Sequence, residues 1–392
     1  MSLLTLIATS DIHGRYLPDS RHTTGGAMAS VASYVRSIRN DGADVLVLDC
    51  GDMLTDSPQA HCIGPGAEKL IQKAGYDAFC PGNHDLQLPL PSWLPCQPVV
   101  CNIILPDSYT GAIPRPYALF PCGNTRVAVT GVLTGETPLL PGGVSVTAPS
   151  EALEKVRDSL QSLHTKPHLT VLLIHAGKEE AKRIFTAAKW ADIGIYGHDH
   201  SADIMKMPDN RLLANPGAFG RNFLRITFDT AAPSLTANAV AVTTDGIPPD
   251  SDMAIAADLI HGEINRTLGS ISDSKQLISM LHKALHLATG APLTAVTPPT
   301  HRVDTPNTIT VEELYRMMPY DDYVSISLHS VRELREAGLD VCRHDSTQNV
   351  TDEDTPRTTA SDTHSLFPTH GFIGISLQTL LAKLLVGQPL LH

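Results

Sequence analysis

The chain has 392 residues, 42% of them hydrophobic, and its 41 acidic residues outnumber its 29 basic ones to give a formal net charge of −12 at pH 7. This length and apolar content suffice for two globular domains with cores of their own and exclude wholesale disorder. Because an acidic chain is poorly suited to bind phosphate backbones, no nucleic-acid polymer is expected as a partner.

Apolar runs that read as strands alternate with helical patterns over the first part of the chain. The predicted strands are, in order, residues 4–9, 44–48, 77–80, 98–105, 118–132 (two strands joined by a turn at Gly123-Asn124), 170–174, 192–196, 212–214, 222–227 and 235–243. The predicted helices are one that opens at Gly25-Gly26 and others at 67–73, 151–163 and 179–190. This alternation predicts an α/β sandwich, and the later hairpins predict a mixed sheet.

A proline-rich stretch at residues 246–250 predicts a domain boundary, with a first domain at 1–248 and a second at 249–392. The second domain is predicted to hold, in chain order, a helix at 252–266, a helix at 276–287, a strand at 293–296, a helix at 310–317 with Thr310 as its N-cap, a strand at 323–328, a helix at 331–337, and a terminal strand and helix within 372–386. Residues 343–368 are rich in Thr, Ser and Asp, which predicts a long surface loop or a disordered segment.

The sequence also bears on location. No run is long and apolar enough to span a membrane, so no membrane partner is expected. The amino end leads into the first predicted strand without the basic region of a signal peptide, and the seven cysteines lack the CxxC spacing of zinc or redox sites and read as free thiols. The expected location is cytoplasmic, and export stays open if a leader has been removed. The oligomeric state is left open.

Five short polar segments each follow directly after a predicted strand. In order they are Asp11-Ile12-His13, Gly51-Asp52, Gly82-Asn83-His84-Asp85, His175 and Gly197-His198-Asp199-His200. Asp, Asn and His bind small hard-to-borderline metal ions, and residues at the ends of parallel strands converge in space. Extended backbone would place Asp11 and His13 on the same side. Each segment alone could be an ordinary turn, but their joint occurrence indicates a two-metal centre.

The chemistry that such a centre serves is phosphoester hydrolysis, which needs a hydroxide at neutral pH, an in-line attack and neutralisation of the phosphoryl oxygens. Two divalent ions roughly 3.5–4 Å apart meet these needs and lower the pKa of a bridging water to about 7. A carboxylate must hold the two cations together, and Asp52 is the candidate. The bridging hydroxide would attack phosphorus in line, and a histidine such as His84 suits the role of a general acid or of a phosphate-binding cation. Mixed nitrogen and oxygen ligands leave the ions open among Mn²⁺, Zn²⁺ and Fe.

The order of these segments resembles the signature of the calcineurin-like metallophosphoesterases. The resemblance implies a four-layer α/β/β/α sandwich with the metals between the loops of two sheets. It implies that one metal is bound by Asp11, His13, Asp52 and His200. It implies that the other is bound by Asp52, Asn83, His175 and His198. It also implies that His84 lies near the leaving group and is oriented by Asp85.

Further segments resemble the 5′-nucleotidase and 2′,3′-cyclic-nucleotide 2′-phosphodiesterase branch. These are Asp-Ile-His-Gly-Arg up to Arg15, the Asn215-Pro216-Gly217 turn, and residues 308–322. The predicted substrate contacts are Arg15, Arg302 and Tyr320. The implied second domain is a smaller α+β domain, shortened because the branch's Gly-Gly-Asp-Gly-Tyr-like segment is missing.

We therefore expect a metal-dependent phosphohydrolase with two divalent metal ions that acts on nucleotides or related small phosphate esters. Whether it prefers mono- or diesters is left open. The alternatives are a phosphomonoesterase or phosphodiesterase with a non-nucleotide substrate, and a non-catalytic metal-binding sensor of the same fold.

Overall fold

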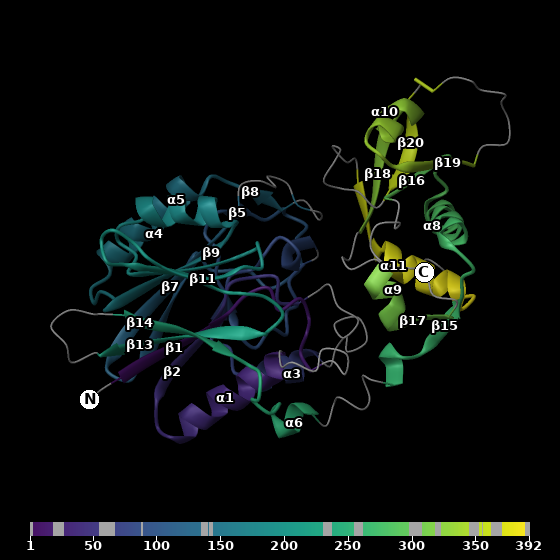
Figure 1. The fold of residues 1–392 in the computed structure, drawn as a ribbon. Helices are drawn as coiled ribbons and strands as arrows, with labels where there is room; N and C mark the ends of the chain where they lie inside the picture. Colours follow the sequence, from purple (N-terminus) through teal and green to yellow (C-terminus); the bar gives the residue numbers. More distant parts are fainter. Residues whose placement is uncertain are drawn as a thin grey trace. The chain divides into compact units, whose positions relative to one another are not determined.

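The computed structural model describes residues 3–18, 27–54, 67–87, 89–134, 140, 144–229, 237–254, 262–297, 308–317, 323–344, 353–354, 356–361 and 371–388. Their contacts divide the chain into two compact units. The first unit contains the described residues up to 254, and the second contains those from 262 onward. Each unit is drawn in Figure 1.

Two six-stranded sheets form the centre of the first unit. The first sheet has the order β14-β13-β1-β2-β3-β4 and contains β1 (Leu3–Thr9), β2 (Asp44–Asp49), β3 (Ala78–Phe79), β4 (Gln97–Pro98), β13 (Asn222–Asp229) and β14 (Ala237–Thr243). The second has the order β11-β12-β10-β9-β7-β6 and contains β6 (Tyr117–Cys122), β7 (Thr125–Leu133), β9 (Leu169–His175), β10 (Ile193–Gly197), β11 (Ala202–Lys206) and β12 (Leu212–Pro216). In both sheets the central strands are parallel and antiparallel pairs lie toward an edge, which confirms the mixed sheets.

Helices cover the outer faces of these sheets (Figure 1). Helices α1 (Met28–Asn40) and α3 (Ala67–Ala74) lie on the side of the first sheet, while α4 (Pro149–Ser162) and α5 (Lys178–Ala187) lie on the side of the second. The four layers confirm the expected α/β/β/α sandwich. A small pair, β5 (Ile103–Ile104) and β8 (Ser145–Val146), completes the described strands of this unit.

The local sequence explains why these elements form. Helix α4 starts with Pro149 at its first position, where a missing N–H is harmless, and buries Leu153, Val156 and Leu160 at helical spacing. All seven residues of β9 are buried, as expected for a parallel strand covered on both faces. Each such Leu, Ile or Val side chain stabilises the fold by about 1.5–3 kcal/mol. This rigid core holds the strand ends in place.

The second unit is a smaller α+β domain, as expected. Its main sheet has the order β19-β16-β20-β18-β21, formed by β16 (Leu293–Val296), β18 (Tyr323–His329), β19 (Asp340–Arg343), β20 (Arg357–Ser361) and β21 (Gly371–Ser376). A second pair joins β15 (Thr267–Ser270) to β17 (Thr308–Thr310). The helices are α8 (Ser274–Thr289), α9 (Val311–Met317), α10 (Val331–Glu336) and α11 (Leu377–Leu385). Thr310 accepts a hydrogen bond from the Glu313 amide at 3.2 Å, which confirms the N-cap.

The boundary expected after residue 248 lies too early. Helix α6 (Ser251–Ala254) packs on α1 and belongs to the first unit. Asp250 pairs with Arg36 at 2.6 Å, and Asp252 pairs with Lys73 at 2.7 Å. The prolines mark a turn. The ion pairs attach the residues after the turn to α1 and α3, so the first unit continues beyond it.

Two expected elements also differ. The single strand expected at 98–105 is divided between β4 and β5, which belong to different sheets. Between them, the buried Asn102 side chain forms hydrogen bonds with the backbone of Leu133 and Thr147 and turns the chain out of the first sheet. The loop expected at 343–368 contains strand β20, which is paired on both sides by β16 and β18 despite its polar sequence. Much of the remaining stretch lies outside the described residues.

The cysteines and the hydropathy of the helices were also predicted from the sequence. The six cysteines in the described part of the chain are free thiols, whereas Cys62 lies outside it. Among the described helices, none combines the length and the hydropathy needed to cross a bilayer.

Candidate metal centre

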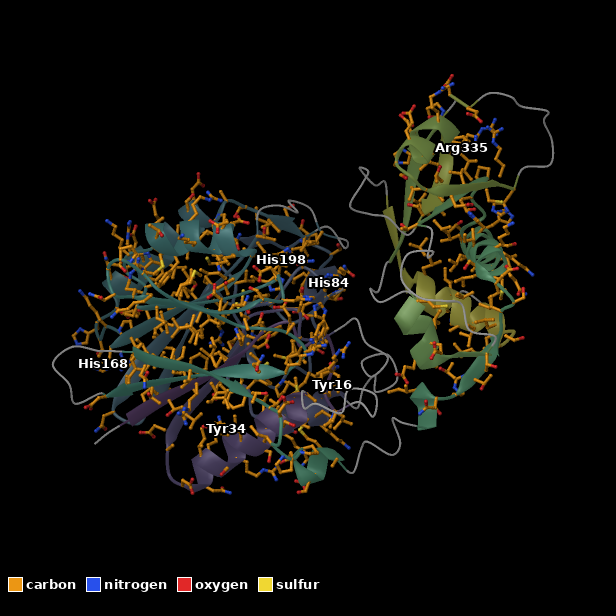
Figure 2. All side chains as sticks on the ribbon, viewed as in Figure 1. Tyr16, Tyr34, His84, His168, His198 and Arg335 are labelled. Carbon is orange, nitrogen blue, oxygen red and sulfur yellow. The ribbon has the colours of Figure 1, made fainter. Side chains whose placement is uncertain are left out.

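The polar segments lie together at the carboxyl ends of the central strands. Asp11 follows β1, Asp52 follows β2, and His84 follows β3. In the second sheet, His175 ends β9 and β10 is followed by His198-Asp199-His200. Because neighbouring strands in each set are parallel, these ends open at the same edge. Figure 2 shows His84 and His198 at this end of the first unit, with His168 at the opposite end.

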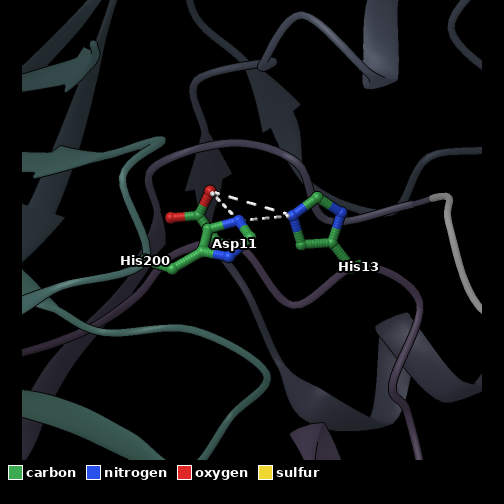
Figure 3. A group of neighbouring side chains, drawn as sticks. All are labelled: Asp11, His13 and His200. Carbon is green, nitrogen blue, oxygen red and sulfur yellow. Dashed lines mark hydrogen bonds and ion pairs between the residues drawn. The ribbon is translucent and has the colours of Figure 1, made fainter. Parts of the chain in front are cut away.

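The first group of possible ligands consists of Asp11, His13 and His200 (Figure 3). The Nε2 atoms of His13 and His200 are 3.0 Å apart, and Oδ1 of Asp11 lies 4.0 and 3.7 Å from them. Asp11 and His13 are buried, whereas about a third of the His200 side chain is exposed. The three ligand atoms are close enough to hold one ion.

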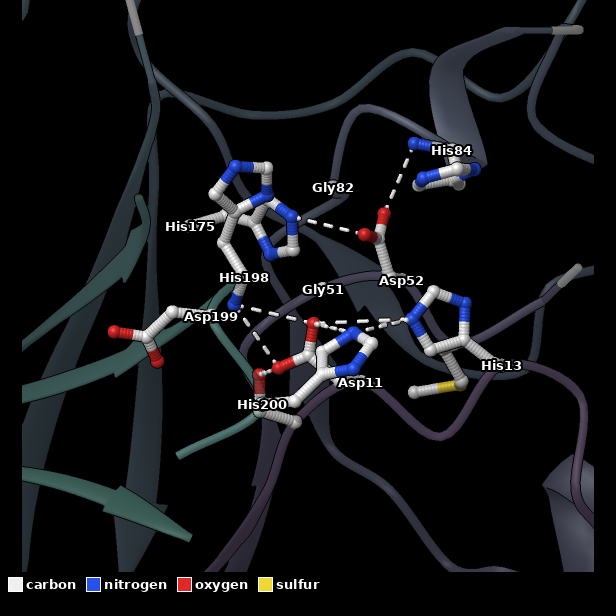
Figure 4. A network of polar contacts seen from close by, with 12 residues as sticks. Asp11, His13, Gly51, Asp52, Gly82, His84, His175, His198, Asp199 and His200 are labelled. Atoms are coloured by element: carbon white, nitrogen blue, oxygen red, sulfur yellow. Dashed lines mark hydrogen bonds and ion pairs between the residues drawn. The ribbon is translucent and has the colours of Figure 1, made fainter. Parts of the chain in front are cut away.

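The second group consists of Asp52, His175 and His198 (Figure 4). His175 Nε2 lies 3.1 Å from Asp52 Oδ2 and 3.2 Å from the amide oxygen of Asn83. His175 Nδ1 lies 2.8 Å from the Cys50 carbonyl oxygen. With the Nδ1–H donating to that carbonyl, Nε2 is left to face the carboxylate and amide oxygens, which is the arrangement that a metal-binding histidine needs. Mixed nitrogen and oxygen donors fit a borderline divalent ion.

The backbone at this site differs from the extended geometry expected for the Asp-x-His segments. Positive φ angles, the left-handed region, occur at Asp11 (52°), His13 (47°), Asp52 (53°), His198 (88°) and His200 (56°). This region is unfavourable for residues other than glycine and is concentrated at functional sites. Two hydrogen bonds hold the loop after β1 to the loop after β2: the Asp11 amide donates to the Gly51 carbonyl at 2.8 Å, and the His13 amide donates to the Asp52 carbonyl at 2.7 Å.

Two glycines are required by close packing around the second group. A Cβ added to Gly51, whose φ is +103°, would collide with His175 Nδ1. A Cβ added to Gly82 would collide with the carboxylate and the amide of Asp52. Only glycine allows the two loops to approach this closely.

Asp52 and His175 form a buried ion pair. Burial opposes ionisation of Asp52, but His175, together with His84 and His13, holds the pKa of this carboxyl well below its usual range. Burial alone would lower the pKa of His175, but Asp52 and Asp11 raise it to about 9. Burial, with a contribution from His13, lowers the pKa of His200. A cation at the second group would therefore take the place of a proton.

Asp85 holds a loop, in contrast to the expected contact with His84. Its carboxylate accepts hydrogen bonds from the backbone amides of Gly82 at 2.9 Å, Met53 at 3.1 Å and Leu54 at 2.9 Å. Burial raises the pKa of Asp85 to about 6, with a further contribution from Asp52. These contacts tie the loop after β3 to the loop that carries Asp52. The geometry supports a structural role for Asp85 and gives no support to its assignment as an orienting residue.

His84 lies where a catalytic residue could act. Its backbone amide donates to Asp52 Oδ1 at 2.9 Å, and its ring centroid is 5.5 Å from that of His13. These contacts place His84 beside both groups of possible ligands.

Phe219 is a site residue that sequence reasoning missed. Its ring packs against His13 and His200, with centroids 5.7 and 5.1 Å apart, and its amide donates to the Asp11 carbonyl at 2.8 Å. The guanidinium of Arg15 lies 4.4 Å from the ring centroid and that of Arg221 lies 5.3 Å from it. The signal that could have found Phe219 was its place just after the Asn215-Pro216-Gly217 turn. Of the other expected substrate contacts, Arg302 and Tyr320 lie outside the described residues.

Asp199 explains why that turn lies beside the site. Its carboxylate accepts from the Asn215 side-chain amide at 3.0 Å and from the backbone amide of Lys178 at 3.1 Å. The loop between His198 and His200 is thereby tied to β12 and to the start of α5. Asp199 therefore supports the histidines on either side of it.

The chain is similar to proteins of a known family. A family model described as calcineurin-like phosphoesterase matches residues 4–202. The 5′-nucleotidase of Vibrio cholerae is 30% identical over 191 residues, which cover 44% of this chain and 34% of that protein. A snake venom 5′-nucleotidase from Gloydius brevicauda is 28% identical over 221 residues, which cover 50% of this chain and 37% of that protein. The match thus spans little more than a third of these curated relatives.

A solved structure extends the likeness of fold to both units. The crystal structure of a 5′-nucleotidase precursor from Thermus thermophilus superposes with a TM-score of 0.69. The two chains are 17% identical, and the alignment covers 100% of this chain and 97% of the other. At this identity the likeness concerns the fold alone.

Proposed function

This chain belongs to the calcineurin-like phosphoesterase family, and from that premise we propose that it hydrolyses phosphate esters of nucleotides or related small molecules with two bound divalent metal ions. The observation that carries the proposal is the arrangement of six Asp and His side chains in two groups of possible ligands at one edge of the sandwich. Asn83, beside the second group, completes the expected set.

The two ions would be held by the two groups described above. One would take Asp11, His13 and His200, and the other would take His175, His198 and Asn83, with Asp52 shared between them. When bound, two such ions supply a hydroxide at neutral pH and neutralise the phosphoryl oxygens. The donor set suits Mn²⁺, Zn²⁺ or Fe without selecting one of them.

The chain's own side chains would complete the reaction. His84, whose backbone amide donates a hydrogen bond to the Asp52 carboxylate, would assist the leaving oxygen. Arg15, stacked over Phe219 beside the first group, would bind a phosphate oxygen through its guanidinium. We also propose Arg302 and Tyr320 as substrate contacts from the second domain.

A nucleotide substrate is supported by the names of the relatives, which are 5′-nucleotidases. The test is a screen of nucleoside monophosphates, diphosphates and cyclic phosphates against the metal-loaded protein. Turnover of at least one nucleotide ester is expected. If only non-nucleotide esters are hydrolysed, the nucleotide part of the proposal is wrong.

Hydrolysis itself is tested with p-nitrophenyl phosphate and bis-p-nitrophenyl phosphate in the presence of Mn²⁺. Asp52→Asn and Asn83→Ala should abolish turnover, whereas Asp158→Asn, at an exposed carboxylate on α4, should leave it unchanged. If neither ester is turned over while the metal is shown to be bound, the proposed hydrolysis is wrong, and the alternative of a metal-binding sensor of the same fold is favoured.

A further inference from the structure

We propose that Gln87 is the positioning residue that orients the imidazole of His84, and this inference rests on the proposed phosphohydrolase function. Its side-chain Nε2 lies 3.5 Å from His84 Nδ1. This is the outer limit of a hydrogen bond, and catalytic contacts of this length commonly shorten when substrate binds.

The backbone brings these two side chains together. His84 is followed directly by the 3₁₀ turn η2 (Asp85–Gln87), in which the Gln87 amide donates to the His84 carbonyl at 3.3 Å. In 3₁₀ geometry, side chains three residues apart lie above one another. Gln87 therefore lies on the same side of the turn as His84. Asp85, the neighbour in sequence, points instead to the backbone amides of Met53 and Leu54 in the loop that carries Asp52, and to that of Gly82 in its own loop.

A second, independent observation is that part of the Gln87 amide is unpaired. The side chain is 5% exposed, and its Oε1 has no hydrogen-bond partner among the residues that the structure describes. Leaving a buried polar atom without a partner is unfavourable, so most such atoms are either paired or functional. Nδ1 of His84 lies beside Nε2 of this amide, and Oε1 would take it as a partner if the two amide atoms exchanged places.

An amide is suited to this contact because it carries a donor and an acceptor on one carbon. A half-turn about the last side-chain bond exchanges Nε2 and Oε1. Gln87 can then donate to a bare Nδ1 or accept from an Nδ1–H, and in either case it holds the ring. The other ring nitrogen, Nε2, is directed away from Gln87. An oriented Nε2 is what assistance to a leaving oxygen requires.

The kinetic test compares two esters that differ in leaving group, phenyl phosphate and p-nitrophenyl phosphate. The p-nitrophenolate leaves readily without a proton, whereas phenolate depends more on assistance from His84. Gln87→Leu, which keeps the size but loses both polar atoms, should lower kcat about 10-fold or more for phenyl phosphate and about threefold or less for p-nitrophenyl phosphate. KM should stay unchanged. Gln87→Glu, which keeps an oxygen acceptor, should recover most of the loss.

The matched control is Gln72→Leu, at an exposed glutamine on α3. It should leave both rates unchanged. Equal losses on both esters after Gln87→Leu, or no loss on either, would overturn the inference. If Gln87→Leu does not fold, as judged by circular dichroism, Gln87→Met takes its place with the same expectation.

A spectroscopic readout separates this inference from the proposed function. In the metal-free protein with ¹⁵N-labelled histidine, the Nδ1 signal of His84, assigned with His84→Gln, should shift in Gln87→Leu and stay in place in Gln72→Leu. An unmoved Nδ1 signal in Gln87→Leu would overturn the contact. If the wild-type protein hydrolyses neither ester but the signal shifts, the contact stands and the proposed function fails.

Discussion

Metal binding at the second group should release one proton at neutral pH. The cause is the buried His175, whose pKa is raised to about 9 while Asp52 beside it stays ionised. A metal ion needs the unprotonated Nε2 of His175, so the proton must leave. Burial, with a contribution from His13, lowers the pKa of His200, which favours its unprotonated form before an ion binds.

The magnitude follows from the pKa. At pH 7, two units below a pKa of about 9, roughly 99% of His175 carries a proton, so close to one proton leaves His175 when an ion binds at the second group. Competition between this proton and the metal ion for His175 weakens metal binding by about 2.7 kcal/mol at pH 7, which is about 100-fold in apparent metal affinity. Because a proton is released, raising the pH strengthens binding, by about tenfold between pH 7 and pH 8. Above pH 9, where His175 is already unprotonated, a further rise in pH no longer strengthens metal binding through this residue.

The assay is titration calorimetry with Mn²⁺ under nitrogen, in buffers of different ionisation enthalpy. The slope of the observed enthalpy against the buffer enthalpy gives the number of protons. His164→Gln, at an exposed histidine after α4, is the matched control and should give the same slope. A slope of zero at pH 7, or an affinity that is flat between pH 7 and pH 8, would refute the ion pair between His175 and Asp52.

Three further predictions concern the loops around the site. Gly82→Ala would push a Cβ into Asp52, so metal affinity measured by calorimetry should fall by about 10-fold or more. Asp85→Ala leaves three backbone amides without their acceptor and should lower the free energy of unfolding in urea by about 2–4 kcal/mol, whereas Asp158→Ala should change it by about 0.5 kcal/mol or less. Phe219→Ala removes the ring that Arg15 stacks on, so KM for a phosphate monoester should rise. An unchanged KM would contradict a role for Phe219 in positioning Arg15.

The sequence predicted the layered fold and the possible ligands because both depend on local patterns. Apolar runs such as β9 and polar residues at their ends, such as His175, report directly on strand position. Their convergence follows from parallel pairing, which the alternation of strands and helices indicates.

What the sequence did not predict depends on long-range contacts. Strand β20 has a polar sequence and exists because two neighbouring strands pair with it. Asp85 is adjacent to His84 in sequence, yet its carboxylate bonds Met53 and Leu54, more than thirty residues away. Phe219 reaches the site from β12 onward, through a turn whose place is set by Asp199. No local pattern carries these contacts.

The hydrogen bond that joins the two sheets at Asp11 has a consequence for when the site can form during synthesis of the chain. The Asp11 carboxylate, at the end of the first sheet, accepts from the His198 amide at the end of the second at 3.0 Å. The first possible ligand and the last are thus separated by nearly two hundred residues that must leave the ribosome before the site can close. An ion can have its full set of ligands only after β10 has docked, and it should be lost when the two sheets come apart.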